Sequence, residues 1–156
     1  MNLTANTLST VLRIIKIVAT SKRRDIDLRS FGSVLMFGYT GVVFKTDLYA
    51  YGECLAIQLY HEVNDVVGIW HEPLATLTIN VPDHGLAPGC FFAKTYGENT
   101  FLRYPLLSQG WFEDTGDRVG VGMTHVEVWK PSQKFCDAFL AAHQAEVEFL
   151  NEHALV

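Results

Sequence analysis

The first candidate for a catalytic motif is the triplet Asp114-Thr115-Gly116. Retroviral-type aspartic proteases carry this triplet after a strongly apolar strand, and each of two chains supplies one aspartate to a shared dyad. Here Glu113 precedes the triplet and Asp117 follows it, so three carboxylates are crowded together. Asp and Gly are also the residues that ordinary turns use. The triplet is therefore predicted to form a turn, and it does not by itself indicate a protease.

Histidine is the next candidate, because imidazole serves both as a metal ligand and as a proton carrier. Three neighbouring pairs place an imidazole beside a carboxylate: His61-Glu62, His71-Glu72 and Asp83-His84. Neighbours on a strand point to opposite faces, so one such pair does not chelate a single ion. Ligands from separate segments can still converge at one sheet edge. The candidate metal ligands are His61, His71 and His84.

An alternative hypothesis combines these histidines with Asp83 or Glu98, in a small enzyme or metal-binding protein with a site near the 82–99 loop. The cysteines add little, since they are far apart and form no Cys-x-x-Cys pair: Cys54, Cys90 and Cys136. A disulfide framework or a zinc site needs more cysteines than this, so we expect reduced, buried thiols. No catalytic residue and no cofactor is predicted. His143 and His153 are expected to face solvent from the terminal helix.

Composition and charge argue against other classes of function. The 156 residues are 49% hydrophobic and 19% charged, which is typical of a globular protein. A net charge of −5 argues against a general nucleic-acid binder, and the basic run at 21–24 (SKRR) is too short to change that. The apolar run at 8–18 contains Arg13 and Lys16 and is shorter than the roughly 20 residues of a membrane span. No membrane partner is expected, a nucleic-acid partner is disfavoured, and a cytoplasmic location is predicted.

The elements that must position these residues follow from hydrophobic periodicity. Apolar residues at helical spacing predict an N-terminal helix over 8–20 and a long C-terminal helix over about 132–153. Stretches rich in β-branched and aromatic residues predict a sheet core over about 34–130, with a central helix at 98–110. Chain length favours a single domain over 1–156. The predicted fold is α+β: an antiparallel sheet of four to five strands, with the helices packed mainly on one face.

Glycine and proline mark the breaks between these elements. A tight hairpin is predicted near Gly52, and the glycine-rich stretch at 111–123 is predicted to be mostly turns. Gly110 is placed as the stop of the central helix, whereas Pro105 conflicts with that helix because proline lacks a backbone donor.

A candidate binding surface comes from the alternation in residues 74–83, LATLTINVPD. One row is apolar and is predicted to face the core: Ala75, Leu77, Ile79 and Val81. The other row is polar and is predicted to share a sheet face with side chains of the preceding strand. Trp129 is added as an aromatic anchor at the rim, since aromatic side chains often anchor interfaces. The predicted flat docking surface consists of Gln58, Tyr60, Thr76, Thr78, Asn80 and Trp129.

Residues 44–130 carry four segments that together form a pattern: YGECLAIQL, EPLATLTINVPD, FFAKTYGEN and GWFEDTGDRVGVG. The pattern resembles a family of small, uncharacterised bacterial proteins of plasmids, phages and integrated elements. Lys94, Glu98 and Asn99 match the family's Lys and Glu-Asn positions, whereas His71 stands where the family has glycine before Glu-Pro. The resemblance implies a mobile-element setting and assigns no catalytic residue.

We therefore expect a non-enzymatic binding protein of a mobile genetic element that acts on a host or mobile-element protein, for example as an inhibitor of a bacterial defence system. Small size, mild acidity and a surplus of aromatic residues favour this hypothesis over the enzyme. A homodimer through the helices at 8–19 or 135–150 is a further alternative, because an amphipathic stripe must be buried against something.

Overall fold

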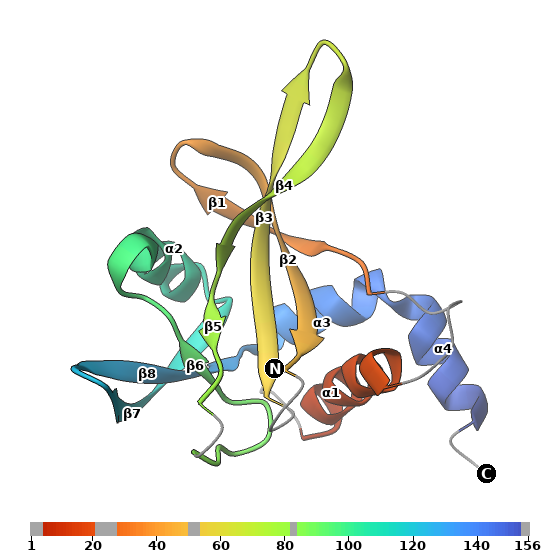
Figure 1. Cartoon of the computed structure of the whole chain (residues 1–156). Helices are drawn as coiled ribbons and strands as arrows, with labels where there is room; N and C mark the ends of the chain where they lie inside the picture. Colours follow the sequence, from red (N-terminus) through yellow and green to blue (C-terminus); the bar gives the residue numbers. More distant parts are fainter. Residues whose placement is uncertain (1–4, 21–27, 50–53, 82–83, 154–156) are drawn as a thin grey trace.

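The computed structural model describes residues 5–20, 28–49, 54–81 and 84–153. The helical elements are α1 (Ala5–Thr20), the 3-10 helix η1 (Gly97–Leu102), α2 (Arg103–Ser108), α3 (Gln133–Ala142) and α4 (Gln144–His153). The strands are β1 (Phe31–Met36), β2 (Tyr39–Leu48), β3 (Leu55–Asp65), β4 (Gly68–Thr76), β5 (Thr78–Ile79), β6 (Phe91–Ala93), β7 (Phe112–Val121) and β8 (Thr124–Pro131). Figure 1 shows their arrangement, which confirms the α+β class.

The strands form two antiparallel sheets of four strands each, where one sheet of four to five strands was predicted. The first sheet has the order β1-β2-β3-β4 and the second the order β5-β6-β8-β7. The stretch at 74–81 accounts for the difference. It was predicted as one strand, but it ends β4 at Thr76 and begins β5 at Thr78, so it contributes to both sheets.

Leu77 is the residue between the two sheets. Its backbone N–H donates to the carbonyl of Ile57 in β3, at 2.9 Å, and its carbonyl accepts from the N–H of Lys94 after β6, at 2.6 Å. The side chain of Leu77 is fully buried. Because the backbone turns here, the predicted two-residue alternation fails, and both Leu77 and Thr78 face inward.

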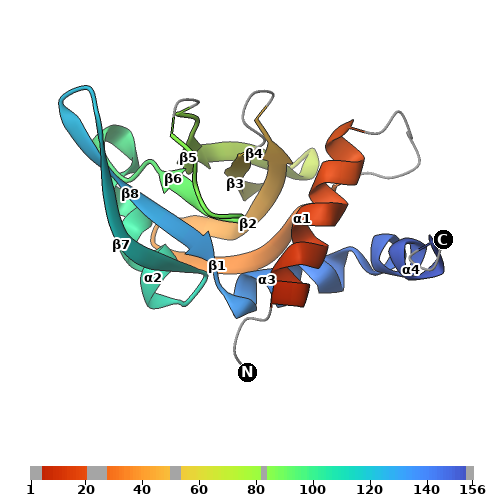
Figure 2. The same cartoon turned by 90° about the horizontal axis from the view of Figure 1, so that it is seen from below.

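Figure 2 shows α1 and α3 lying beside the strands of the first sheet. One large apolar core contains side chains from β1 to β3, from β6 to β8, and from α1 to α4. Phe44, Phe112 and Phe135 contribute rings from a strand of each sheet and from α3, with centroids 5.0 to 5.5 Å apart. The predicted stripe of α1 lies on this core through Val11 and Ile15, so it is buried largely within its own chain.

The C-terminal helix differs from the prediction, because it breaks at His143 into α3 and α4. His143 was expected to face solvent, and that prediction is wrong: the side chain is fully buried. Its Nδ1 lies 2.8 Å from the carbonyl of Phe139, and its Nε2 accepts from the N–H of Arg29 at 3.1 Å. The ring thus supplies both a donor and an acceptor where the helix ends.

Pro105 does not disturb the central helix, because α2 begins at Arg103 and the proline occupies its first turn. A backbone N–H there has no partner within the helix in any case. Gly110 follows with a φ of 78°, the left-handed conformation expected of a helix stop.

Several predicted features lie outside the described residues: the basic run at 21–24, the turn near Gly52, Asp83 and the side chain of His153. Among the helices that the structure describes, none combines the length and the apolar character needed to cross a membrane.

Candidate functional site

Half of the predicted polar surface is assembled on the first sheet. Gln58 in β3 lies directly opposite Thr76 in β4, and both side chains are exposed. The hydroxyl of Tyr60 donates to Oε1 of Gln58 at 3.1 Å. Lys45 in β2 is the partner of Gln58 on the other side and is also exposed. A small polar patch therefore exists on this face, and its side chains can offer hydrogen bonds to a partner.

The other three residues of the predicted surface are buried or half-buried. Trp129 was placed at an exposed rim, which is wrong, because its side chain is fully buried between Phe91 and Phe112. Thr78 is buried as well, since its Oγ1 accepts the backbone N–H of Ile57 at 3.1 Å and lies 2.9 Å from the hydroxyl of Tyr49. Asn80 is half-buried beyond the end of β5. Thr78 thus has a structural role at the sheet junction.

The three candidate metal ligands do not converge. His61 lies opposite Glu72, and His71 lies opposite Glu62. Paired residues share a face and neighbours alternate, so His61 and His71 project from opposite faces of the β3–β4 hairpin. His84 lies on the 84–90 loop, where its ring contacts Phe92. Across the described residues, no three His, Cys, Asp or Glu side chains are grouped as a metal site would require.

The Asp114-Thr115-Gly116 triplet lies inside β7, in a stretch predicted to be turns. Asp114 pairs with Trp129 and Arg118 pairs with Glu127, so β7 carries three residues here where β8 carries one. Gly116 has a φ of 89°, which this bulge requires. Thr115 Oγ1 donates to the carbonyl of Val128 at 2.7 Å. Glycine-rich composition suggested turns, but the cross-strand contacts with β8 make this a bulged strand.

The bulge brings together an arginine–carboxylate cluster, which consists of Arg103, Asp114, Arg118 and Glu127. Glu127 accepts from Nε and Nη2 of Arg103 at 2.9 to 3.0 Å and from Nη2 of Arg118 at 3.0 Å. Asp114 accepts from both terminal nitrogens of Arg118 at 2.8 to 2.9 Å. The hydroxyl of Thr95 donates to Glu127 as well, at 2.8 Å. Two positive and two negative groups thus compensate one another.

The electrostatics of this cluster disfavour acid–base chemistry. Hydrogen bonds from Arg118, together with the backbone N–H of Gly116, lower the pKa of Asp114 from 3.8 to about 2. At neutral pH the carboxylate is therefore ionised and already paired. A protease dyad needs two carboxyls that share one proton, whereas each carboxylate here is bound to guanidinium. The cluster holds β7, β8 and the start of α2 together.

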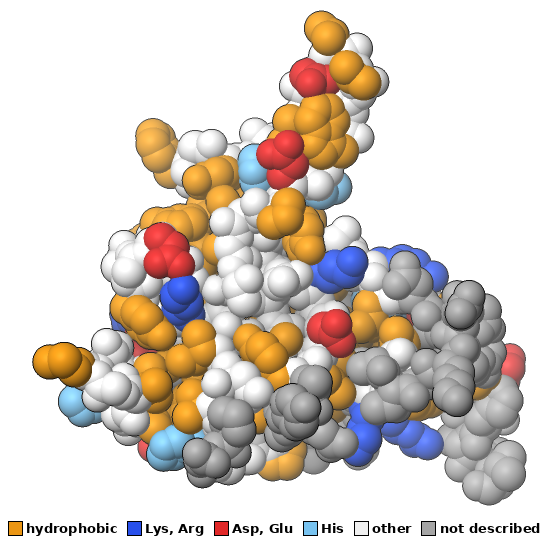
Figure 3. Space-filling model, in the orientation of Figure 1, with side chains coloured by type: hydrophobic (Ala, Val, Ile, Leu, Met, Phe, Trp, Pro, Cys, Tyr) orange, Lys and Arg blue, Asp and Glu red, His pale blue; other side chains and the backbone are white. Residues whose placement is uncertain are grey.

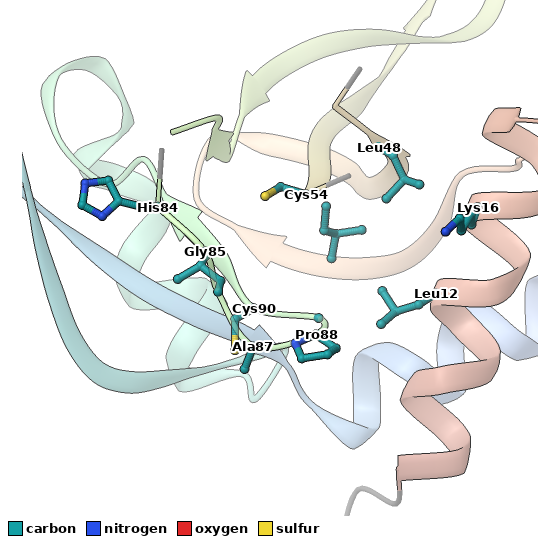
Figure 4. Close-up of a pocket in the computed structure, with 12 residues that line it drawn as sticks. Leu12, Lys16, Leu48, Cys54, His84, Gly85, Ala87, Pro88 and Cys90 are labelled. Carbon is teal, nitrogen blue, oxygen red and sulfur yellow. The ribbon is translucent and has the colours of Figure 1, made fainter. Parts of the chain in front are cut away.

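A cavity of about 440 Å³ lies between α1, the β2–β3 end of the first sheet and the 84–90 loop (Figure 4). Its lining combines leucines with Lys16, Cys54, His84 and Cys90. Burial raises the pKa of the Cys90 thiol, which disfavours the thiolate that a nucleophile needs. The deeper Cys136 lies in the core, where burial raises its pKa to about 12. Cys90 and Cys136 are therefore weak nucleophiles.

The exposed apolar surface was not among the features predicted from the sequence. In the β1–β2 hairpin, Leu35 and Phe37 are exposed, and together with Phe101 and Tyr104 they line a groove of about 460 Å³. Tyr39 continues this surface, because its ring stacks on Phe101 with a centroid distance of 6.2 Å. Figure 3 shows hydrophobic side chains at the tip of this hairpin and at the tip of the β3–β4 hairpin.

The surface extends from Tyr39 to the β3–β4 hairpin. The Tyr39 ring contacts the ring of His61 edge-on, at 5.3 Å between centroids. His61 shares its face with Val63 two residues further, and Val63 lies opposite Trp70. At the tip, Val66 is fully exposed and Val67 is 87% exposed. We call this surface the apolar strip; it consists of Leu35, Phe37, Tyr39, Phe101, Tyr104, Val66, Val67 and Trp70.

The β3–β4 hairpin owes its projection to a difference in strand length. β2 pairs with β3 only as far as Val43 and Tyr60, whereas β3 and β4 continue to Asp65 and Gly68. Residues 61–72 therefore pair only with each other in the described ladders, and we call them the projecting ribbon. Figure 1 shows the ribbon extending beyond the body of the protein.

A sequence signal for this surface did exist. Residues 64–68 read NDVVG, with Asn-Asp and Gly marking a turn around two valines. Two apolar residues in the centre of a tight turn cannot reach the core, so they must be exposed. The same reasoning applies to Phe37, which precedes Gly38 between two short strands.

Among protein-family models, curated proteins and solved structures, no match to this chain is found.

Proposed function

We propose that this chain is a non-enzymatic binding protein that docks on a protein partner through the apolar strip. The observation that carries the proposal is the exposure of large apolar side chains on two neighbouring hairpins, joined by the ring contacts of Tyr39. Scattered exposed apolar residues are normal, but a contiguous group that includes Phe, Tyr and Trp is typical of an interface.

Hydrogen bonds at the β1–β2 end of the strip support this use. Leu35 is tied to α2 through Gln109, whose Oε1 accepts from the Leu35 N–H at 2.9 Å and whose Nε2 donates to the Leu35 carbonyl. A surface that is already ordered loses little conformational freedom when a partner binds. The mobile-element setting and the role as an inhibitor of a bacterial defence system belong to this proposal and rest on the family resemblance. The cytoplasmic location belongs to it as well and rests on the three widely separated cysteines.

Affinity capture from a bacterial lysate tests the proposal when three proteins are compared: the wild type, the double variant Phe37→Ser/Tyr104→Ser, and the control Met123→Ser. Met123 is as exposed as Phe37 but lies at the tip of the β7–β8 hairpin. We expect the wild type and the control to retain one protein in stoichiometric amount and the double variant to lose it. Equal recovery by all three folded proteins would contradict the proposal.

The cavity beside the 84–90 loop favours a second candidate, the small enzyme or metal-binding protein. It offers an enclosed volume of about 440 Å³ and the polar groups of Lys16, His84 and Cys90. Elemental analysis of protein purified without a metal-affinity tag tests the metal-binding form. Stoichiometric metal, with loss of binding in His84→Ala, would favour this candidate over the docking protein.

A further inference from the structure

The net negative charge of the chain comes from one segment. Residues 46–93 contain six acidic residues and no lysine or arginine, whereas the remainder contains eleven acidic and twelve basic residues. The segment therefore carries −6 and the rest of the chain +1. This segment includes β3, β4 and β5, so the net charge of −5 describes one part of the surface more than the whole protein.

The projecting ribbon combines this charge with apolar side chains. Glu62, Asp65 and Glu72 lie on it beside the exposed residues Ile69 and Trp70. The indole N–H of Trp70 donates to Oε1 of Glu72 at 3.1 Å, which holds a carboxylate at the edge of the ring. In Figure 3 the ribbon shows red and orange side chains, with pale blue histidine at its base and without the dark blue of lysine or arginine.

The ribbon also has unpaired edges. Beyond Tyr60, β3 has no further pairing with β2, and β4 is the last strand of its sheet. An isolated two-stranded ribbon is only marginally stable in water, and exposed edges invite a further strand. Burying the apolar groups at its tip away from water lowers the free energy of a complex. These features favour insertion of the ribbon into a cleft over contact with a flat surface.

The charge of the ribbon distinguishes among lipid, nucleic acid and protein as its partner. Biological membranes present an anionic surface that attracts basic segments, so three carboxylates and no lysine or arginine disfavour a lipid target. Nucleic acid is disfavoured for the same reason. A protein cleft lined with lysine and arginine attracts this ribbon, and an apolar floor accommodates its tip.

We propose that the projecting ribbon inserts into a cleft of a partner protein, with the valine tip and Trp70 on an apolar floor and with Glu62 and Glu72 facing lysine and arginine at the rim. This inference rests on the proposed function and specifies the chemistry of its partner. Because the rim charges attract at a distance, they act mainly on the rate of association.

Site-specific photocrosslinking locates the contact in the full-length protein. A photoreactive phenylalanine analogue replaces Val67 in one protein and Met123 in a matched control, both of which are hairpin-tip positions with exposed side chains. Each protein is irradiated in a bacterial lysate, and adducts are identified by mass spectrometry. We expect one protein to crosslink to position 67 and not to position 123, and we then purify that protein for titration.

Charge variants test the rim. Asn64→Lys/Glu72→Lys changes the ribbon by three charges, and Glu148→Lys/Asn151→Lys makes the same change on exposed positions of α4. At low salt we expect the ribbon variant to bind the crosslinked protein about tenfold or more weakly, mainly through slower association, and the α4 variant to bind nearly as the wild type does. Raising the salt concentration reduces the difference between the two variants.

The outcomes separate the two proposals. A partner that crosslinks at position 67 but binds equally well after charge reversal overturns the basic rim and leaves the proposed function intact. A partner that depends on Phe37 and Tyr104 but does not crosslink at position 67 overturns ribbon insertion. Absence of any partner contradicts both proposals. Binding to phosphatidylglycerol vesicles, detected by a blue shift in fluorescence that is lost in Trp70→Phe, overturns the protein cleft in favour of a lipid surface.

Discussion

The β7–β8 and β3–β4 hairpins have the same architecture but differ in how their carboxylates are paired. Each is a long antiparallel pair with an apolar residue at its tip. In β7–β8, the carboxylates of Asp114 and Glu127 are bound by two arginines and fasten the pair to α2. In β3–β4, the carboxylates of the ribbon have no arginine or lysine within the same segment of chain. Acidic residues of one protein are thus neutralised by arginine in one hairpin and not by neighbouring basic residues of the chain in the other.

The largest expected effect on stability comes from Glu127→Ala. The substitution removes the shared acceptor of Arg103, Arg118 and Thr95, and hydrogen bonds to charged groups contribute about 1.5–3 kcal/mol. We expect a loss of about 2–3 kcal/mol in the free energy of unfolding, measured by urea titration. Glu72→Ala on the ribbon serves as the control, with a change within about 0.5 kcal/mol. Equal losses in both variants would remove the distinction between the hairpins.

Trp70→Ala should have the opposite effect to Glu127→Ala. It should weaken binding to the partner and leave the stability of the fold nearly unchanged. Truncation of a tryptophan hot spot costs about 2 kcal/mol or more in binding free energy. Because Trp70 lies on the ribbon, where it is 37% exposed, we expect little change in the urea midpoint. Calorimetric titration of the purified partner measures the first quantity and urea unfolding the second. A large loss of stability with unchanged affinity would show that Trp70 has a structural role.

Lowering the pH should destabilise the β7–β8 hairpin through protonation of Asp114. Its pKa is lowered from 3.8 to about 2, so the folded state binds this proton less readily than the unfolded state does. The stabilisation is complete above about pH 4 and is lost as the pH falls towards 2. Arg118→Met should raise the pKa of Asp114 towards its ordinary value and cost about 1 kcal/mol at neutral pH. Carbon-detected NMR titration of the carboxyl measures the pKa directly, and an unchanged value would contradict the role of Arg118.

The smallest effect is expected from lengthening the tip of the ribbon. Insertion of Gly-Ser between Val66 and Val67 adds loop length, which costs under about 1 kcal/mol. The same insertion between Gly116 and Asp117 would separate Arg118 from Asp114 and should cost more. Thermal unfolding of the two insertion variants gives the comparison, and a greater loss from the tip insertion would contradict it.

The sequence allowed the α+β class and the amphipathic α1 to be predicted, because each depends on local periodicity. Three features depend on tertiary contacts and could not be predicted this way. The change of sheet at Leu77 depends on backbone hydrogen bonds to Ile57 and Lys94. The burial of His143 depends on contacts with Arg29 and Phe139, and the bulge in β7 depends on pairing with β8.

The candidate site was predicted in part. Gln58, Tyr60 and Thr76 share a surface because alternation along paired strands determines which side chains are neighbours. Trp129 was misplaced, since a tryptophan in a strand can face either way and only the packing of Phe91 and Phe112 decides. The exposed valines at 66 and 67 carry no polar or titratable group, so residue chemistry alone does not identify them as a site.

Leu77 also determines where the chain can change in length over evolution. Insertions at the ribbon tip leave every sheet contact in place, so descendants of this protein can lengthen or shorten the ribbon freely. A single inserted residue at Leu77 would shift β5 against β4, and either Ile57 or Lys94 would lose its backbone partner. We therefore expect relatives to vary in ribbon length and to keep a constant spacing between β4 and β5.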